Sequence, residues 1–285
     1  MHTVLRSGRF YFWPIIGANV LTMTLAIGGD PIRAVTFSVV IACLASFGFL
    51  LNDIWDRDVD RVNKAGHFEH SDAITIRVGR LVGSSFLIGG LGIALWLGLR
   101  EFILASIIAL ALTAYTILLR KLLIIPTIVA AVLATSPLWT PMVLWPKSIG
   151  LLKYVFLTAI IIIVAARETL MDARDRLGDT AGGRHTLATV FGERIAKFVG
   201  VTLTISASVL LGITVVYSAS TLAIGSMFIA TGIGGAIIYL LVSPAVATLH
   251  NRLEERSVLK RYVLWSRTAM ALIPPLNLIL WQIWP

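Results

Sequence analysis

Charged residues are scarce in this chain. Asp, Glu, Lys and Arg together make up 14% of its 285 residues, whereas hydrophobic residues make up 57%. A soluble domain carries about 25% charged residues. The apolar residues fall in runs of about 20, the length of a helix that crosses roughly 30 Å of hydrocarbon. This composition excludes an ordinary soluble fold and predicts an all-α integral membrane protein.

The chain is also poor in cysteine, and it lacks the features of a nucleic-acid-binding protein. Cys43 is its single cysteine, which excludes an intramolecular disulfide. The net charge is +9, but no basic stripe with interleaved aromatic residues is present, so we expect no nucleic-acid partner. A membrane surface explains the excess of basic residues better. The sequence indicates no obligate protein partner.

Apolar runs separated by charge clusters and by proline or glycine predict nine transmembrane helices, in a single domain over residues 1–285. The helices are expected at about 10–28, 32–52, 82–99, 101–119, 122–145, 150–171, 195–218, 221–242 and 262–284, with edges uncertain by about 2–4 residues. Pro126 and the pair Pro274–Pro275 should kink the fifth and ninth helices. Pro14 falls in a first helical turn, where proline is tolerated.

Nine spans place the connecting loops alternately on the two sides of the membrane, and the charges divide unevenly between those sides. All but four of the 24 lysines and arginines lie on one side; the exceptions are Arg33, Arg100, Lys147 and Lys153. The basic side is therefore predicted to be cytoplasmic, in a multi-pass protein of the cell membrane. The 15 acids, except Asp30 and Glu101, lie on the same side. Because acids contribute little to orientation, their accumulation needs a separate reason.

The acids on this side concentrate in two clusters with the same spacing. The first reads NDIWDRDVD, from Asn52 to Asp60, and the second reads MDARDRLGD, from Met171 to Asp179. Each cluster has aspartates at intervals of three and then four residues; they are Asp53, Asp56 and Asp60, and then Asp172, Asp175 and Asp179. Such intervals place side chains on one face of a helix. The second and sixth spans each run into a cluster, which indicates two repeats, about 1–121 and 122–242, followed by a last helix.

Clustered carboxylates repel one another unless a cation lies between them. Mg²⁺ prefers oxygen ligands, and its usual second partner in a protein is a substrate phosphate. We therefore expect all six aspartates to be metal ligands, on two helix ends that face each other. Four of them are also the catalytic candidates that would grip a diphosphate at the membrane surface; these are Asp53, Asp56, Asp172 and Asp175.

Basic and aromatic residues near the clusters suit the same diphosphate. Arg120 and Lys121 end the fourth span, and Arg167 lies about one turn before Asp172. Together they would neutralise a departing diphosphate. The ring of Tyr115 is among those that could stabilise the carbocation left by an allylic diphosphate. Taken singly, each of these residues also fits a membrane anchor or a packing group.

Two other interpretations stay open at this point. The acids could be solvated loop residues balanced by neighbouring arginines, although two clusters with identical spacing disfavour this. The chain could also be an ion-coupled transporter. Transporters place their coupling acids near the middle of the bilayer, whereas these acids lie at helix ends, which disfavours transport.

The two clusters resemble the motifs of the UbiA superfamily of intramembrane prenyltransferases. The first motif of that family, N-D-x-x-D-x-x-x-D, is met in full from Asn52 to Asp60. The second, D-x-x-D-x-x-x-D followed by G-x-x-T-L, is met by the second cluster and by Gly183, Thr186 and Leu187. The stretch RETLMDARDRLGD is closest to the version in archaeal geranylgeranylglyceryl-phosphate prenyltransferases. The Y-S-x-x-L-K motif has a counterpart from Tyr115 to Arg120, with Arg in place of Lys.

The resemblance implies nine helices around a central cavity, with two cytoplasmic cap loops that carry the aspartates. It implies two Mg²⁺ ions, an isoprenyl diphosphate whose tail lies in an apolar tunnel, and a hydrophobic aromatic or lipid acceptor that attacks the allylic carbocation. Asn52 and Lys64 join the substrate-binding candidates on the same ground. The expected activity is therefore prenyl transfer within the membrane, with membrane lipid as the surroundings.

The chain departs from the family pattern after the first motif. Many members continue N-K-P-x-R-P, whereas this chain continues with Asn63, Lys64 and then AGHFEH. The arginine that the family places near its substrates is missing from this loop. The departure keeps a second activity open, in which a terpene cyclase of the same fold quenches the cation internally without an external acceptor.

Overall fold

The computed structural model describes residues 2–63, 68, 70–146 and 150–219, together with Val242, Val246 and Leu264. Every regular element within these residues is a helix, which confirms the all-α prediction. Except for Val242 and Leu264, the predicted spans 221–242 and 262–284 lie outside the described residues. Lys64 and the predicted kink at Pro274–Pro275 lie outside them as well.

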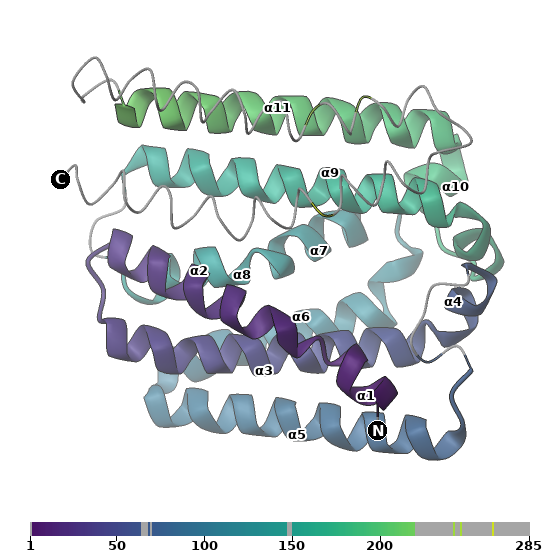
Figure 1. Cartoon of the computed structure of the whole chain (residues 1–285), viewed down its shortest axis with the longest axis horizontal. Coiled ribbons are helices and arrows are strands. Elements are labelled where there is room, and N and C mark those ends of the chain that lie inside the picture. Colours follow the sequence, from purple (N-terminus) through teal and green to yellow (C-terminus); the bar gives the residue numbers. More distant parts are fainter. Residues whose placement is uncertain are drawn as a thin grey trace.

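Six longer helices form most of the described fold (Figure 1). They are α2 (Trp13–Ala26), α3 (Pro31–Trp55), α5 (Ala73–Leu97), α6 (Leu99–Ile117), α9 (Leu151–Ala181) and α11 (Glu193–Ala219). The shorter elements are α1 (His2–Ser7), η1 (Phe10–Phe12), α4 (Arg57–Asn63), η2 (Leu119–Lys121), α7 (Ile125–Ala134), α8 (Ser136–Leu144) and α10 (Leu187–Phe191).

Five helices in the described residues are long and apolar enough to cross a membrane, namely α3, α5, α6, α9 and the Glu193–Thr214 part of α11. The bent pair α7 and α8 makes a sixth span if it is counted as one. The structure therefore agrees with a multi-pass membrane protein. The predicted first span is shorter than expected, because η1 takes up its start and α2 has 14 residues, about 21 Å of helix.

Local sequence explains where several helices begin. The carboxylate of Asp30 accepts a hydrogen bond from the backbone N–H of Ile32 at 2.9 Å, and Pro31 follows it as the first residue of α3. Asp72 caps α5 in the same way, accepting from the N–H of Thr75 at 2.7 Å. Side chains that cap the first turn satisfy donors with no partner inside the helix. The cap at Asp72 starts α5 nine residues earlier than the expected start of the third span.

The predicted kink at Pro126 is wrong. Pro126 lies in the first turn of α7, where a missing N–H has no effect on the helix. The break in the fifth span falls at Thr135 instead, between α7 and α8, whose axes differ by 70°. Helix α8 begins at Ser136 just after this break, and Pro137 lies in its first turn.

The helices pack into two apolar layers on either side of a cavity. One layer is built around Phe37, Ile41 and Ile108 of α3 and α6, and the other around Leu138 and Ile160 of α8 and α9. Helix α2 contributes to both layers. Figure 1 shows α3 beside α5 and α9 beside α11, with α4, α10 and the C-terminal ends of α3 and α9 at one end of the bundle. Both aspartate clusters therefore lie at the same end of the molecule.

Candidate functional site

The two aspartate clusters differ in their local helical structure. The first is interrupted, since α3 ends at Trp55, Asp56 is its C-cap and α4 begins at Arg57. One uninterrupted helix is therefore wrong for this cluster, although the N–H of Asp60 still donates to the carbonyl of Asp56 at 2.8 Å. The second cluster lies wholly inside α9. Helix α9 has 31 residues, about 46 Å at 1.5 Å per residue, so it extends well beyond roughly 30 Å of hydrocarbon.

The N-terminal segment holds the first aspartate of the first cluster. The side chain of Asp53 is 6% exposed, and it accepts hydrogen bonds from the Ser7 hydroxyl at 2.6 Å and from Arg9 Nη2 at 3.0 Å. The guanidinium of Arg9 also lies 4.3 Å from the centre of the Phe49 ring. Arg9 adopts a left-handed backbone conformation, with φ 50° and ψ 43°, which is uncommon for a residue other than glycine. The turn that precedes α2 therefore aims a cation at the first motif.

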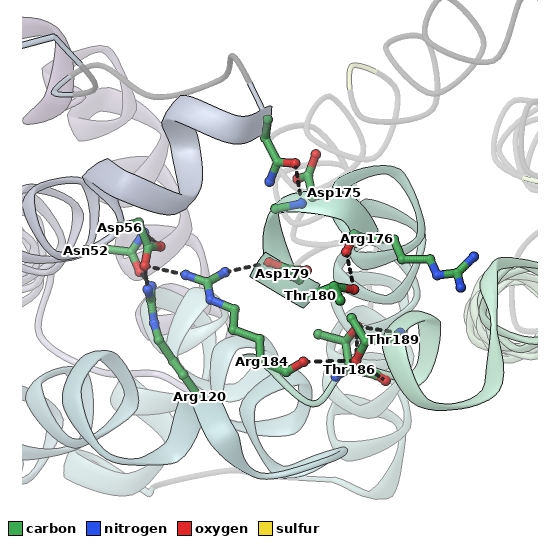
Figure 2. A network of polar contacts seen from close by, with 12 residues as sticks. Asn52, Asp56, Arg120, Asp175, Arg176, Asp179, Thr180, Arg184, Thr186 and Thr189 are labelled. Carbon is green, nitrogen blue, oxygen red and sulfur yellow. Dashed lines mark hydrogen bonds and ion pairs between the residues drawn. The ribbon is translucent and has the colours of Figure 1, made fainter. Parts of the chain in front are cut away.

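Two arginines converge on Asp56, as Figure 2 shows. Arg120 pairs with Asp56 and also donates to the amide oxygen of Asn52. Arg184 pairs with Asp56 and donates through Nη1 to Asp179 Oδ1 at 3.1 Å. Asp56 and Asp179 belong to different motifs, so one guanidinium joins the two motifs directly.

Burial alters the electrostatics of this cluster. The side chain of Arg120 is 10% exposed. Burial, and then the positive charge of Arg184, lower the pKa of Arg120 to about 9. The ring of Tyr115 lies 5.5 Å from the Arg120 guanidinium carbon, close enough for a cation–π contact. A buried guanidinium with a second cation nearby is stabilised by any anion that enters the site.

The other predicted residues are less closely gathered. Asp175 pairs with the adjacent Arg174, whose Nε donates to it at 2.6 Å. Arg167 pairs with its neighbour Glu168 at 2.5 Å, and both line the large cavity. Lys121 is exposed on η2 and is not brought to the aspartates. Asp60 is half-buried on α4.

Helix α4 docks closely onto the end of α9. The N–H of Gly178 donates to the side-chain oxygen of Asn63 at 3.0 Å. A Cβ at Gly178 would overlap the Asn63 amide, and one at Gly182 would lie 2.5 Å from Val59. Gly178 lies in the last turn of α9 and Gly182 is its C-cap, four residues later. The two glycines receive two side chains that are four residues apart on α4. This contact sets the first motif against the second.

Two adjoining cavities open beside the cluster. A small polar pocket of about 40 Å³ is lined by Arg120, Asp172 and Arg184, among others. A cavity of about 370 Å³ extends from Arg9, Asn52 and other polar residues into the apolar interior of α2, α3, α6, α8 and α9. Tyr115, Ala130 and Glu168 line both cavities. A small charged pocket therefore meets a larger, mainly apolar cavity at a shared wall.

The donor set fits a divalent ion in its chemistry, because carboxylate oxygens from two helices meet at one end of the bundle and Mg²⁺ prefers such ligands. Within the described residues, however, no three His, Cys, Asp or Glu side chains converge closely enough to hold a metal ion. Guanidinium groups accompany the carboxylates, Arg9 at Asp53 and Arg184 between Asp56 and Asp179. An ion bound between the two motifs therefore requires the Arg184 side chain to withdraw.

Sequence reasoning missed three residues of the site. From the sequence, Arg9 is only one of the basic residues that indicate orientation. Arg184 stands at an unspecified position of the G-x-x-T-L motif, where no residue type is required. Nothing in the sequence gives Glu168, the neighbour of Arg167, a role of its own. A cation inside a motif of acids is the signal that could have identified Arg184.

The chain is similar to curated proteins named digeranylgeranylglyceryl phosphate synthase. The one from Sulfolobus acidocaldarius is 27% identical over 237 residues, covering 79% of this chain and 80% of that protein. The one from Thermococcus sibiricus is 30% identical over 194 residues, covering 66% of this chain and 67% of that protein. The match to the protein from Methanoculleus marisnigri, at 28% identity, spans 63% of each chain.

Solved structures share the fold. A UbiA homolog from Aeropyrum pernix K1 in its apo form superposes with a TM-score of 0.72 at 15% identity, covering 96% of this chain and 99% of that one. A UbiA homolog from Archaeoglobus fulgidus bound to GPP and Mg²⁺ superposes with a TM-score of 0.66 at 16% identity, covering 97% and 99%. The model of the UbiA prenyltransferase family matches residues 11–266. This chain belongs to the UbiA prenyltransferase family.

Proposed function

We propose that this chain transfers a prenyl group from an allylic isoprenyl diphosphate to a hydrophobic acceptor within the membrane, with Mg²⁺ as cofactor. The observation that carries the proposal is the junction of the two cavities. A pocket with Arg120, Arg184 and Asp172 adjoins an apolar cavity of about 370 Å³. An isoprenyl diphosphate has the same two parts, a charged head and an apolar tail.

The head of the substrate would lie among the cations of the cluster. Arg120 and Arg184 line the small pocket, and Arg9 lines the mouth of the large cavity. Bidentate guanidinium groups suit phosphate oxygens. Asp53, Asp56, Asp172, Asp175 and the third aspartate of each cluster are the proposed metal ligands. Mg²⁺, when bound, neutralises charge that develops on the leaving phosphate oxygens.

The chemical step would begin with rupture of the bond between C1 of the prenyl chain and the diphosphate oxygen. The electron pair leaves with the diphosphate, where Arg120 and Arg184 stabilise the added charge. Tyr115 lies at the wall shared by both cavities, and its ring would stabilise the allylic cation. An acceptor oxygen then forms the new bond to C1, and Glu168, which lines the same wall, accepts the hydroxyl proton.

The names of the curated relatives narrow the acceptor. A digeranylgeranylglyceryl phosphate synthase makes a glyceryl phosphate that carries two geranylgeranyl groups. We therefore propose a lipid acceptor with a glyceryl phosphate head and a C20 prenyl donor for this chain. The proposal puts the aspartate motifs on the cytoplasmic side, as the charge asymmetry predicts.

The test is incubation of the purified chain with Mg²⁺ and C10, C15 or C20 diphosphates, with geranylgeranylglyceryl phosphate, with an aromatic acceptor and with neither. We expect mass spectrometry to detect a doubly prenylated glyceryl phosphate together with released diphosphate. Product formation should stop in excess EDTA and return with Mg²⁺. A hydrocarbon or alcohol formed equally well without acceptor would indicate cyclisation, and full turnover in EDTA would contradict the metal assignment.

A further inference from the structure

Arg184 occupies a position that neither motif explains. It follows α9 in the turn made by Gly182 and Gly183, where Gly183 has a φ of 65°, a conformation that suits glycine. The N–H of Arg184 donates to the carbonyl of Asp179 at 2.8 Å. Its own carbonyl accepts from the Thr189 hydroxyl at 2.9 Å. Both sides of its backbone are therefore fixed, while its side chain reaches across to the other motif (Figure 2).

The side chain of Arg184 contacts one carboxylate from each motif. It pairs with Asp56 of the first motif and with Asp179 of the second. The side chain of Asp179 is 2% exposed. Within the described residues, Arg184 is the cation paired with Asp179, whereas Asp56 also has Arg120. A buried carboxylate that loses its paired cation is strongly destabilised unless another cation replaces it.

This geometry makes Arg184 and a divalent ion alternatives at the same carboxylates. A cation between Asp56 and Asp179 lowers their mutual repulsion, and either a guanidinium or a metal ion can serve. Both cannot occupy the space between the two carboxylates at once. The guanidinium of Arg184 stays attached to the chain, so it remains available to these carboxylates at all times. Metal binding must displace it from their oxygens, and the free energy of that displacement weakens metal binding.

We propose that Arg184 is a positioning residue that holds the two aspartate motifs together before metal and diphosphate bind, and that it competes with Mg²⁺ for Asp56 and Asp179. The competition rests on the proposed function, because it takes these aspartates as metal ligands. The pairing of the motifs by Arg184 does not. Arg184 thereby keeps the substrate-free site assembled and sets the Mg²⁺ concentration at which the site loads.

The experiment compares the full chain with Arg184→Gln, which keeps a polar side chain but removes the charge. Arg176→Gln is the matched control, because Arg176 is exposed on the same end of α9 and its side chain points away from the cluster (Figure 2). Thermal unfolding is followed in EDTA and in Mg²⁺, and Mg²⁺ binding to substrate-free protein is measured by titration calorimetry.

We expect Arg184→Gln to lower the melting temperature in EDTA, with most of the loss restored by Mg²⁺. We also expect it to tighten Mg²⁺ binding at least about fivefold, the low end of couplings between two ligands. Arg176→Gln should change neither quantity appreciably. Arg184→Lys keeps the charge but not the two-pronged donor geometry, so it should give smaller changes in the same directions, and it carries the test if Arg184→Gln does not fold.

Three results would overturn the inference. One is a melting temperature in EDTA for Arg184→Gln equal to that of Arg176→Gln, and another is weaker or unchanged Mg²⁺ binding. The third is no Mg²⁺ binding by wild type and Arg184→Gln alike, which removes the competition. Failure of the proposed function would be recognised by a different result: wild type would form no prenyl product in Mg²⁺.

Discussion

At the scale of single residues, the site consists of aspartates already paired with arginines. Asp53 has Arg9, and Asp56 has Arg120 and Arg184. Such pairing reduces the repulsion between clustered, buried carboxylates. It also places guanidinium groups next to the pocket where a diphosphate head would lie. The arginines are therefore as central to the site as the aspartates.

Arg120→Ala should slow the reaction, because it removes a preorganised donor from a largely buried site. The expected loss of transition-state stabilisation, obtained from the ratio of kcat/KM values, is about 2–4 kcal/mol. This is the range for removing one hydrogen-bond donor to developing negative charge. Steady-state kinetics with a prenyl diphosphate measure it. Arg57→Ala is the control, since Arg57 pairs with the exposed Asp58 outside the site. Equal losses of kcat/KM in the two variants would contradict this role, because they would show a general effect of removing positive charge.

The repeated spacing of the two clusters predicts the six aspartates from the sequence. The basic end of the fourth span predicts Arg120, and the family resemblance adds Asn52. Arg9 could not be predicted as a partner of Asp53, because the pair joins the N-terminal turn to the end of α3. Arg184 could not be predicted to reach Asp56 for the same reason. Long-range pairs of this kind depend on how helices pack, which spacing along the chain does not encode.

At the scale of helices, the close approach of α4 to α9 decides where the motifs lie relative to each other. Gly178→Ala should push α4 away, because the new Cβ would overlap the side chain of Asn63. We expect a loss of about 1–3 kcal/mol of stability, as for other overpacked contacts, together with a larger fall in turnover. Thermal unfolding and diphosphate release measure the two effects.

The control for this substitution is Gly89→Ala in α5. Gly89 also lies inside a long helix, but a Cβ there meets no atom within 4 Å. Alanine has a higher helix propensity than glycine, so this variant should be as stable as wild type or more so. A Gly178→Ala protein that is as active as Gly89→Ala would contradict the role of the contact.

The helices themselves were largely predictable, since apolar runs of membrane-spanning length dominate the described sequence. Where a helix begins or ends at a residue other than the predicted one, the cause is local. Asp72 caps α5 early, and α9 continues through the second motif because residues such as Ala173 and Leu177 favour helix until Gly182. The bend at Thr135 does not follow from proline positions, because Pro126 and Pro137 both lie in the first turns of their helices.

At the scale of the whole molecule, two apolar layers enclose a cavity, and one end of the bundle carries the charges. The family match over residues 11–266 and the shared fold confirm the resemblance drawn from the motifs. Both motifs approach each other only because α3 and α9, distant in sequence, end on the same side. The central claim is that the two motifs act as one site.

A double-mutant cycle on Asp56 and Asp179 tests this claim most directly, with diphosphate release from a prenyl diphosphate as the readout. Asp56→Asn and Asp179→Asn should each cut turnover by a factor on the order of 10²–10³, while Asp58→Asn, at an exposed position, should have a mild effect. Groups that act as a unit are strongly non-additive. The account predicts that the double variant is little slower than the slower single variant. Barriers that add fully would contradict it.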